Sequence, residues 1–116
     1  MDHRKLKDNP AALLDHEFAQ ERATALGRLG RALEAALAAL SAFDVDHPRN
    51  GARGEAEQRR RATLVAQASV ALWHFAVQRE ACGLRDMRAV MRDYRVPAEV
   101  AARMGALPEW PASRRR

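Results

Sequence analysis

Apolar side chains recur at steps of three and four residues from Ala11 to Phe43. This spacing places them on one face of a helix, so the segment predicts a single long α-helix of roughly 45 Å. Gly27 and Gly30 lie inside it, and ordinary tolerated glycines are favoured over a close approach of another helix. The apolar positions are Leu14, Phe18, Leu26, Leu29, Leu33, Leu37, Leu40 and Phe43.

A loop is predicted over residues 44–54, DVDHPRNGARG, because a proline, an Asn-Gly pair and acidic turn residues cluster there. A second helix begins at Glu55 and carries two apolar arcs. One arc contains Leu64, Ala68, Leu72, Phe75 and Cys82, and the other contains Val65, Val70, Trp73 and Val77. One antiparallel partner helix cannot cover both arcs, so a third helix and a second subunit are the candidates for the second arc. We therefore expect a dimer interface at Val70, Trp73 and Val77.

The remaining pattern predicts two short helices. Gly83 suits the left-handed residue that ends the second helix, and Asp86 suits an N-cap. Pro97 suits the first position of a final helix that ends at Gly105. The apolar stripes of these two helices are Met87, Val90, Met91 and Tyr94, then Val100 and Met104.

These elements predict an all-α fold. It consists of a long antiparallel helical hairpin plus two short C-terminal helices, and a second copy completes a dimeric helical bundle. Residues 11–107 form the single helical domain. Residues 1–10 are expected to be a flexible tail, and residues 108–116 a flexible basic tail.

Composition agrees with one helical domain. The chain has 116 residues, enough for one modest core, and only 5% of them are aromatic. The longest apolar run is too short to span a bilayer, and no secretory signal follows the first residues. One cysteine cannot form an internal disulfide. We expect a soluble cytoplasmic protein with no membrane contact.

The formal net charge of +5 invites a nucleic-acid interpretation. Between Pro10 and Glu109, however, there are 14 arginines and 13 acidic residues, so that part of the chain is close to neutral. The excess lies in the two tails, where a terminal run of arginines is more often a solvated end than a specific binding arm.

No motif predicts catalysis, a metal or a cofactor. His16 and Gln20 stand as in an HExxH zinc motif, but glutamine replaces the second histidine and is a poor zinc ligand. Asp44 and His47 form a DxxH pair that cannot fill a coordination shell alone. Cys82 lies at the predicted end of a helix, where a thiolate is disfavoured, and we expect it to be a buried structural residue. We predict that the protein is not an enzyme.

Two charged groups near the open end of the hairpin are candidates for interactions. If the loop closes an antiparallel pair, Gln20 and Glu21 come near Gln78 and Arg79, and we expect Glu21 to pair with Arg79. A structural ion pair that fixes the helix register is favoured over a ligand site, because partly buried charges require partners.

A row of arginines at steps of three, four and three crosses the third predicted helix. It could meet phosphates or an acidic protein, but Asp86 and Asp93 neutralise part of it, and a solvated face is the simpler interpretation. The following short helix offers few long polar side chains for reading bases. The row consists of Arg85, Arg88, Arg92 and Arg95.

Three stretches, FAQERATALGRLGRALEAAL, QREACGLRD and DYRVPAEVAARMG, carry a resemblance to a known family. Over roughly Phe18 to Gly105, with the 44–54 loop and the tails left out, the chain resembles an uncharacterised family of short bacterial all-helical proteins, a domain of unknown function. The resemblance implies the helix boundaries and no activity, cofactor or catalytic residue.

By elimination, the sequence predicts a noncatalytic homodimeric protein-interaction module whose protein partner is unknown. The alternative is a nucleic-acid-binding accessory protein that uses the arginine row and the arginine tail.

Overall fold

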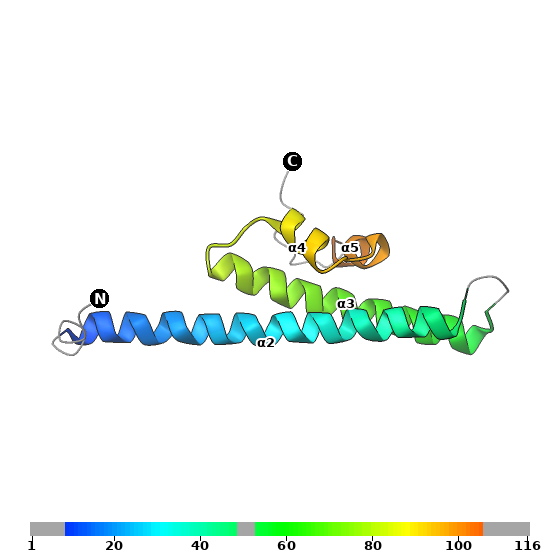
Figure 1. The fold of residues 1–116 in the computed structure, drawn as a ribbon, viewed down its shortest axis with the longest axis horizontal. Helices are drawn as coiled ribbons and strands as arrows, with labels where there is room; N and C mark the ends of the chain where they lie inside the picture. The colour runs from blue at the N-terminus through cyan, green and yellow to red at the C-terminus, as the bar shows by residue number, and fades with distance from the viewer. Residues whose placement is uncertain (1–8, 49–52, 106–116) are drawn as a thin grey trace.

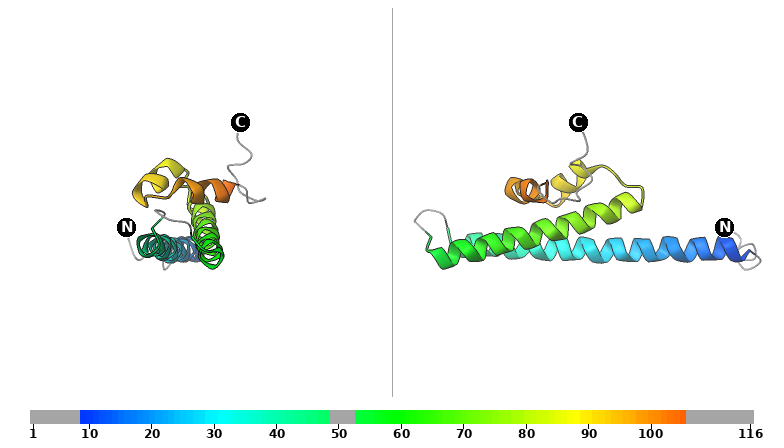
Figure 2. Two further views of the ribbon diagram at one scale, coloured as in Figure 1. Left: turned by 90° about the vertical axis from the view of Figure 1, so that its right-hand side faces the viewer. Right: turned by 180° about the vertical axis from the view of Figure 1, so that it is seen from behind.

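Four helices and no strand make up the part of the chain that the structure, a computed structural model, describes, which is residues 9–48 and 53–105. Helices α2 (Pro10–Asp46) and α3 (Glu55–Ala81) form an antiparallel hairpin (Figure 1). Helices α4 (Met87–Asp93) and α5 (Ala98–Gly105) lie across one side of this hairpin (Figure 2). None of the four combines the length and apolar character needed to cross a bilayer. The predicted all-α class is confirmed.

The helix ends agree with the sequence at most positions. Asn9 caps α2 by accepting a hydrogen bond from the Ala12 amide at 3.2 Å, and Pro10 follows at the first helical position. The first helix continues to Asp46, three residues into the predicted loop, whereas α3 begins at Glu55 as expected. Of the predicted tails, residues 1–8 and 108–116 lie outside the described ranges.

The core is built around α3, which contacts α2 on one side and α5 on another. Ser69 marks the second contact, because its hydroxyl lies 2.8 Å from the Val65 carbonyl and 3.1 Å from the Val100 carbonyl of α5. The helix that packs on this side of α3 is therefore the final predicted helix, α5, and not the third. The buried apolar side chains are Leu33, Leu40, Leu64, Val65, Ala68, Leu72, Phe75, Ala76, Val90, Val100 and Met104.

Residues 82–86 form the corner between α3 and α4, and the predicted terminator occupies it. Gly83 has φ of +82°, the left-handed conformation that glycine adopts without strain. The Gly83 amide donates to the Glu80 carbonyl at 3.0 Å, and the Leu84 amide donates to the Arg79 carbonyl at 2.8 Å. These two bonds close the end of α3 in a Schellman arrangement. Asp86 then caps α4 through bonds from the Arg88 and Ala89 amides.

Gly30 allows a close approach between α2 and the rest of the fold. It is buried, and a Cβ atom placed there would lie 3.0 Å from the Tyr94 hydroxyl and 3.3 Å from the Phe75 ring. Those two rings meet edge to face with centroids 5.3 Å apart. The close-approach interpretation is therefore correct for Gly30. At Gly27 a Cβ atom would meet only the end of the Arg31 side chain, at 3.4 Å.

The two glycines provide a matched test of this packing. Gly27→Ala is expected to raise the free energy of unfolding by up to about 1 kcal/mol, because alanine is the better helix former. Gly30→Ala is expected to lower it, because the new methyl group crowds two aromatic side chains. Urea denaturation followed by circular dichroism measures both. Equal stabilisation by the two variants would contradict the proposed close contact.

Candidate interaction surfaces

The first turns of α2 project beyond the end of α3. The last contacts between the two helices are at Arg22, whose carbonyl accepts from Gln78 Nε2 at 3.3 Å and lies 3.9 Å from Cys82 Sγ. Residues 10–21, here called the α2 overhang, continue as helix past this point and stand apart from the other described helices (Figures 1 and 2). The hairpin register predicted from the loop position is confirmed by the contact between Gln78 and Arg22.

The overhang carries an apolar stripe in contact with solvent. Leu14 and Phe18 lie one turn apart and are 49% and 50% exposed, and Leu13 is 38% exposed on a neighbouring side. The stripe continues along the same side of α2 at Ala25 and Leu29, which are half-buried where α3 begins to cover the helix. The sequence had assigned Leu14 and Phe18 to the hairpin face, but α3 ends too early to reach them.

The predicted dimer surface on α3 is largely occupied by the chain itself. Trp73 is half-buried and packs against the core of the same chain. Val77 is half-buried, and only Val70 of the three is classed as exposed, at 44%. The Trp73 indole N–H is buried and has no hydrogen-bond acceptor among the described residues.

The predicted pair of Glu21 and Arg79 does not form among the described residues. Arg79 instead donates to the Asp86 carbonyl at 3.3 Å, and its guanidinium lies 5.8 Å from the centre of the Phe75 ring. The expected register was right, but Arg79 is directed toward the corner and not toward α2. Glu21 is exposed.

Cys82 occupies the C-cap of α3 and is half-buried. It is therefore less buried than the sequence predicted. Its sulfur lies 4.0 Å from Gln78 Nε2 as well as near the Arg22 carbonyl.

The arginine row is exposed at all four positions, Arg85, Arg88, Arg92 and Arg95. It is not the face of one helix, as the spacing had indicated. Helix α4 has seven residues, so Arg85 lies in the corner before it and Arg95 lies in the turn after it, with φ of +52°. Arg92 Nε is 3.3 Å from Asp93 Oδ1, in a pair whose two side chains are both well exposed.

A group of ion pairs at the loop end of the hairpin was not predicted. The guanidinium of Arg61 on α3 bonds both carboxylate oxygens of Asp44 on α2, at 2.7 and 2.9 Å, and both oxygens of Glu99 on α5, at 2.7 and 2.6 Å. Arg53 adds a bond to Asp44 at 3.1 Å. One planar side chain thus joins three helices in two bidentate contacts. The partners lie 17 and 38 positions from Arg61, so no local pattern indicated the contact.

These contacts shift the ionisation of the group. The hydrogen bond from Arg61 is the main cause that lowers the pKa of Asp44 from 3.8 to about 2. The hydrogen bonds from Glu99 and Asp44 raise the pKa of Arg61 above its ordinary value. Asp44 and Arg61 are therefore charged at neutral pH, and the bonds of Arg61 tie α2, α3 and α5 together.

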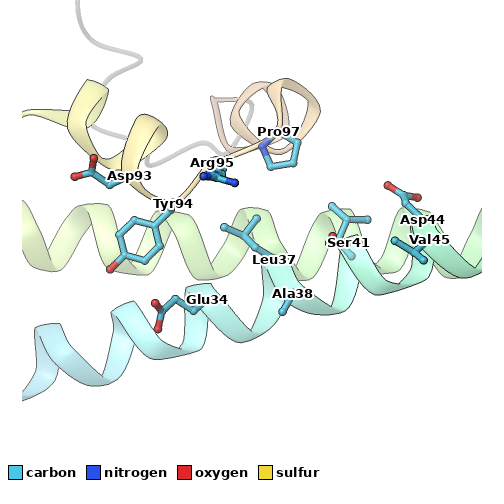
Figure 3. A pocket seen from close by; sticks show the side chains of 11 residues that line it. Glu34, Leu37, Ala38, Ser41, Asp44, Val45, Asp93, Tyr94, Arg95 and Pro97 are labelled. Atoms are coloured by element: carbon cyan, nitrogen blue, oxygen red, sulfur yellow. The ribbon is translucent and has the colours of Figure 1, made fainter.

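A cleft of about 820 Å³ lies between α2 and the turn from α4 to α5 (Figure 3). Its apolar lining includes Leu37, Val45 and Pro97, and Tyr94 reaches from the end of α4 toward α2 and Glu34. Acidic side chains outnumber basic ones in the lining, which comprises Glu34, Leu37, Ala38, Leu40, Ser41, Asp44, Val45, Asp93, Tyr94, Arg95 and Pro97.

The candidate metal ligands do not converge. Asp44 is held by arginines, while His47 Nδ1 lies 3.1 Å from the Phe43 carbonyl and its Nε2 lies 3.5 Å from Glu57. Within residues 9–48 and 53–105, no group of three or more His, Cys, Asp or Glu side chains is arranged to hold a metal ion.

A model of one protein family, described as a family of unknown function (DUF6665), matches residues 4–112. The match confirms the resemblance to an uncharacterised family. It is wider than the predicted span of Phe18 to Gly105, because it includes the 44–54 loop and parts of both tails. No curated protein and no solved structure matches the chain.

The ion pairs predict a pH dependence of stability. Since folding lowers the pKa of Asp44, its contribution is complete above about pH 4 and is lost as the pH falls toward 2. Asp44→Asn is expected to lower the free energy of unfolding at pH 7 by about 1 kcal/mol or less, because the Asp44 side chain is 38% exposed and water screens it. The variant should also flatten the decline between pH 4 and pH 2.

Denaturant melts at pH 7, 4, 3 and 2 measure this effect. Asp46→Asn is the matched control, because Asp46 is exposed and lies two residues away on the same helix. The same loss of stability in both variants would argue against a specific role for Asp44.

Proposed function

The chain belongs to the DUF6665 family, whose function is unknown, and we propose that it is a noncatalytic protein-interaction module that forms a homodimer through the α2 overhang. The observation that supports this proposal is the exposed stripe of Leu14 and Phe18 on the part of α2 that no other described helix covers.

The overhang would be stabilised if another surface covered its apolar stripe. The overhang extends a helix that is already formed, so it needs no nucleus of its own, but it lacks the tertiary contacts that provide most helical stability in proteins. Two large apolar side chains, each about half exposed, add a further reason for burial. A second copy provides an identical stripe, and a two-fold axis lets both overhangs be covered at once.

The contact would be short. An overhang of twelve residues is about 18 Å long, so the interface lies at the low end of the range for stable complexes. We therefore expect a dissociation constant in the micromolar range. Such a dimer would carry two copies of the acidic cleft, and a protein partner that bound both would gain avidity.

Sedimentation velocity at several protein concentrations in the range of tens of micromolar tests whether the chain forms a dimer. Leu14→Glu with Phe18→Glu is expected to give a monomer at every concentration, because it buries two charges in the interface. Val70→Glu is the matched control, since Val70 is similarly exposed but lies on α3. A wild-type chain that sediments as a monomer throughout would refute the proposal, and loss of the dimer in Val70→Glu alone would return the interface to α3.

Nucleic-acid binding is the second candidate, and the exposure of all four arginines of the row supports it. The interaction-module proposal predicts no binding of a labelled duplex at 0.15 M salt, because few arginines face the phosphates and Asp93 neutralises one of them. Fluorescence anisotropy across a salt series, with Arg88→Glu/Arg92→Glu as the comparison, measures this. Binding that persists at 0.15 M salt and is lost in the double variant would favour the second candidate.

A further inference from the structure

The spacing of residues along the overhang indicates how two copies of it could pair. Ala11, Leu14, Phe18, Glu21 and Ala25 follow one another at steps of three, four, three and four. This is the spacing of the core positions of a coiled coil, which form a continuous seam along one side of a helix. The first four are exposed, and Ala25 is half-buried where α3 begins to cover α2. The seam is thus confined to the overhang.

We propose that the two overhangs of a dimer pair antiparallel along this seam, with Leu14 of one copy opposite Phe18 of the partner subunit. This inference rests on the proposed homodimer and specifies its geometry. In this register Leu14 and Phe18 form two equivalent central layers about the two-fold axis. Ala11 of each copy then faces Glu21 of the partner subunit, so a small residue lies opposite a long one.

Among the seam residues, charge favours this direction of pairing. The antiparallel register brings Glu21 next to the first turn of the partner's α2, which is the positive end of the helix dipole. A parallel pair would instead place the two Glu21 carboxylates side by side, and like charges at that distance repel.

The shape of the chain also favours it. The rest of the fold, which includes α3, the corner and α4, lies beside α2 from the point where the overhang ends (Figures 1 and 2). A parallel pair would bring both of these bodies to the same end of the seam. An antiparallel pair places one at each end, so the two copies do not compete for space.

Disulfide trapping tests the direction and the register in a Cys82→Ser background. An equimolar mixture of Ala11→Cys and Glu21→Cys chains is expected to form a cross-linked dimer under mild oxidation. Each chain alone is expected to stay uncross-linked, because identical positions would lie about 15 Å apart along the axis. A mixture of Ala12→Cys and Gln20→Cys is the matched control, since it has the same axial register but both residues lie off the seam.

The outcomes separate this inference from the proposed function. Cross-linking of the single variants by themselves, or a wild-type dimer whose mixed Ala11→Cys and Glu21→Cys chains do not cross-link, would overturn the antiparallel seam and leave the homodimer intact. A wild-type chain that sediments as a monomer would overturn both. Glu21→Gln should weaken dimerisation about two- to fivefold, whereas Glu34→Gln, which is exposed on α2 but lies outside the overhang, should leave it unchanged.

Discussion

The packing of α3 against both α2 and α5 is the constraint on which the arrangement of the chain depends. The bonds from Arg61 to Asp44 at the loop end of α2 favour one register of α3 beside α2. Once that register is set, a helix of 27 residues beside one of 37 must end before its partner does. The contact at Arg22 marks that point. The exposed stripe on the overhang is therefore a consequence of how the opposite end of the hairpin is fixed.

Helix α3 packs against both α2 and α5, and small residues at these contacts make this possible. Ala68 and Ser69 are fully or almost fully buried, between side chains of α2 and α5. Gly30 gives Tyr94 and Phe75 room to approach α2 from the side of α4. A chain with few aromatic residues can build a core in this way, because short side chains let helix backbones come close and still exclude water. Larger side chains such as Leu33, Leu72 and Phe75 then fill the remaining space.

Helical periodicity predicted the features that depend on local sequence. The long helices, the Gly83 terminator and the Asp86 cap all follow from spacing and from backbone preference within a few residues. The direction of a half-buried side chain depends on what packs beside it, so the sequence could not show that Trp73 packs against the core of its own chain. The same holds for the contact of Arg61 with Glu99, which joins residues 38 positions apart. The overhang could have been predicted, because the predicted loop position and helix lengths already gave a hairpin whose first helix is longer than its second.

The ties that hold α5 have a consequence for the order of folding. The hairpin closes through a contact between residues 17 positions apart, whereas α5 attaches through Ser69 and Arg61 across 31 and 38 positions. Closing a longer loop loses more chain entropy, so the hairpin has the smaller barrier and α5 docks onto a surface that already exists. The reverse applies to opening, because eight residues can detach without separating α2 from α3. Hydrogen exchange in α5 should therefore be governed by local release, while the centre of the hairpin exchanges only when the whole chain unfolds.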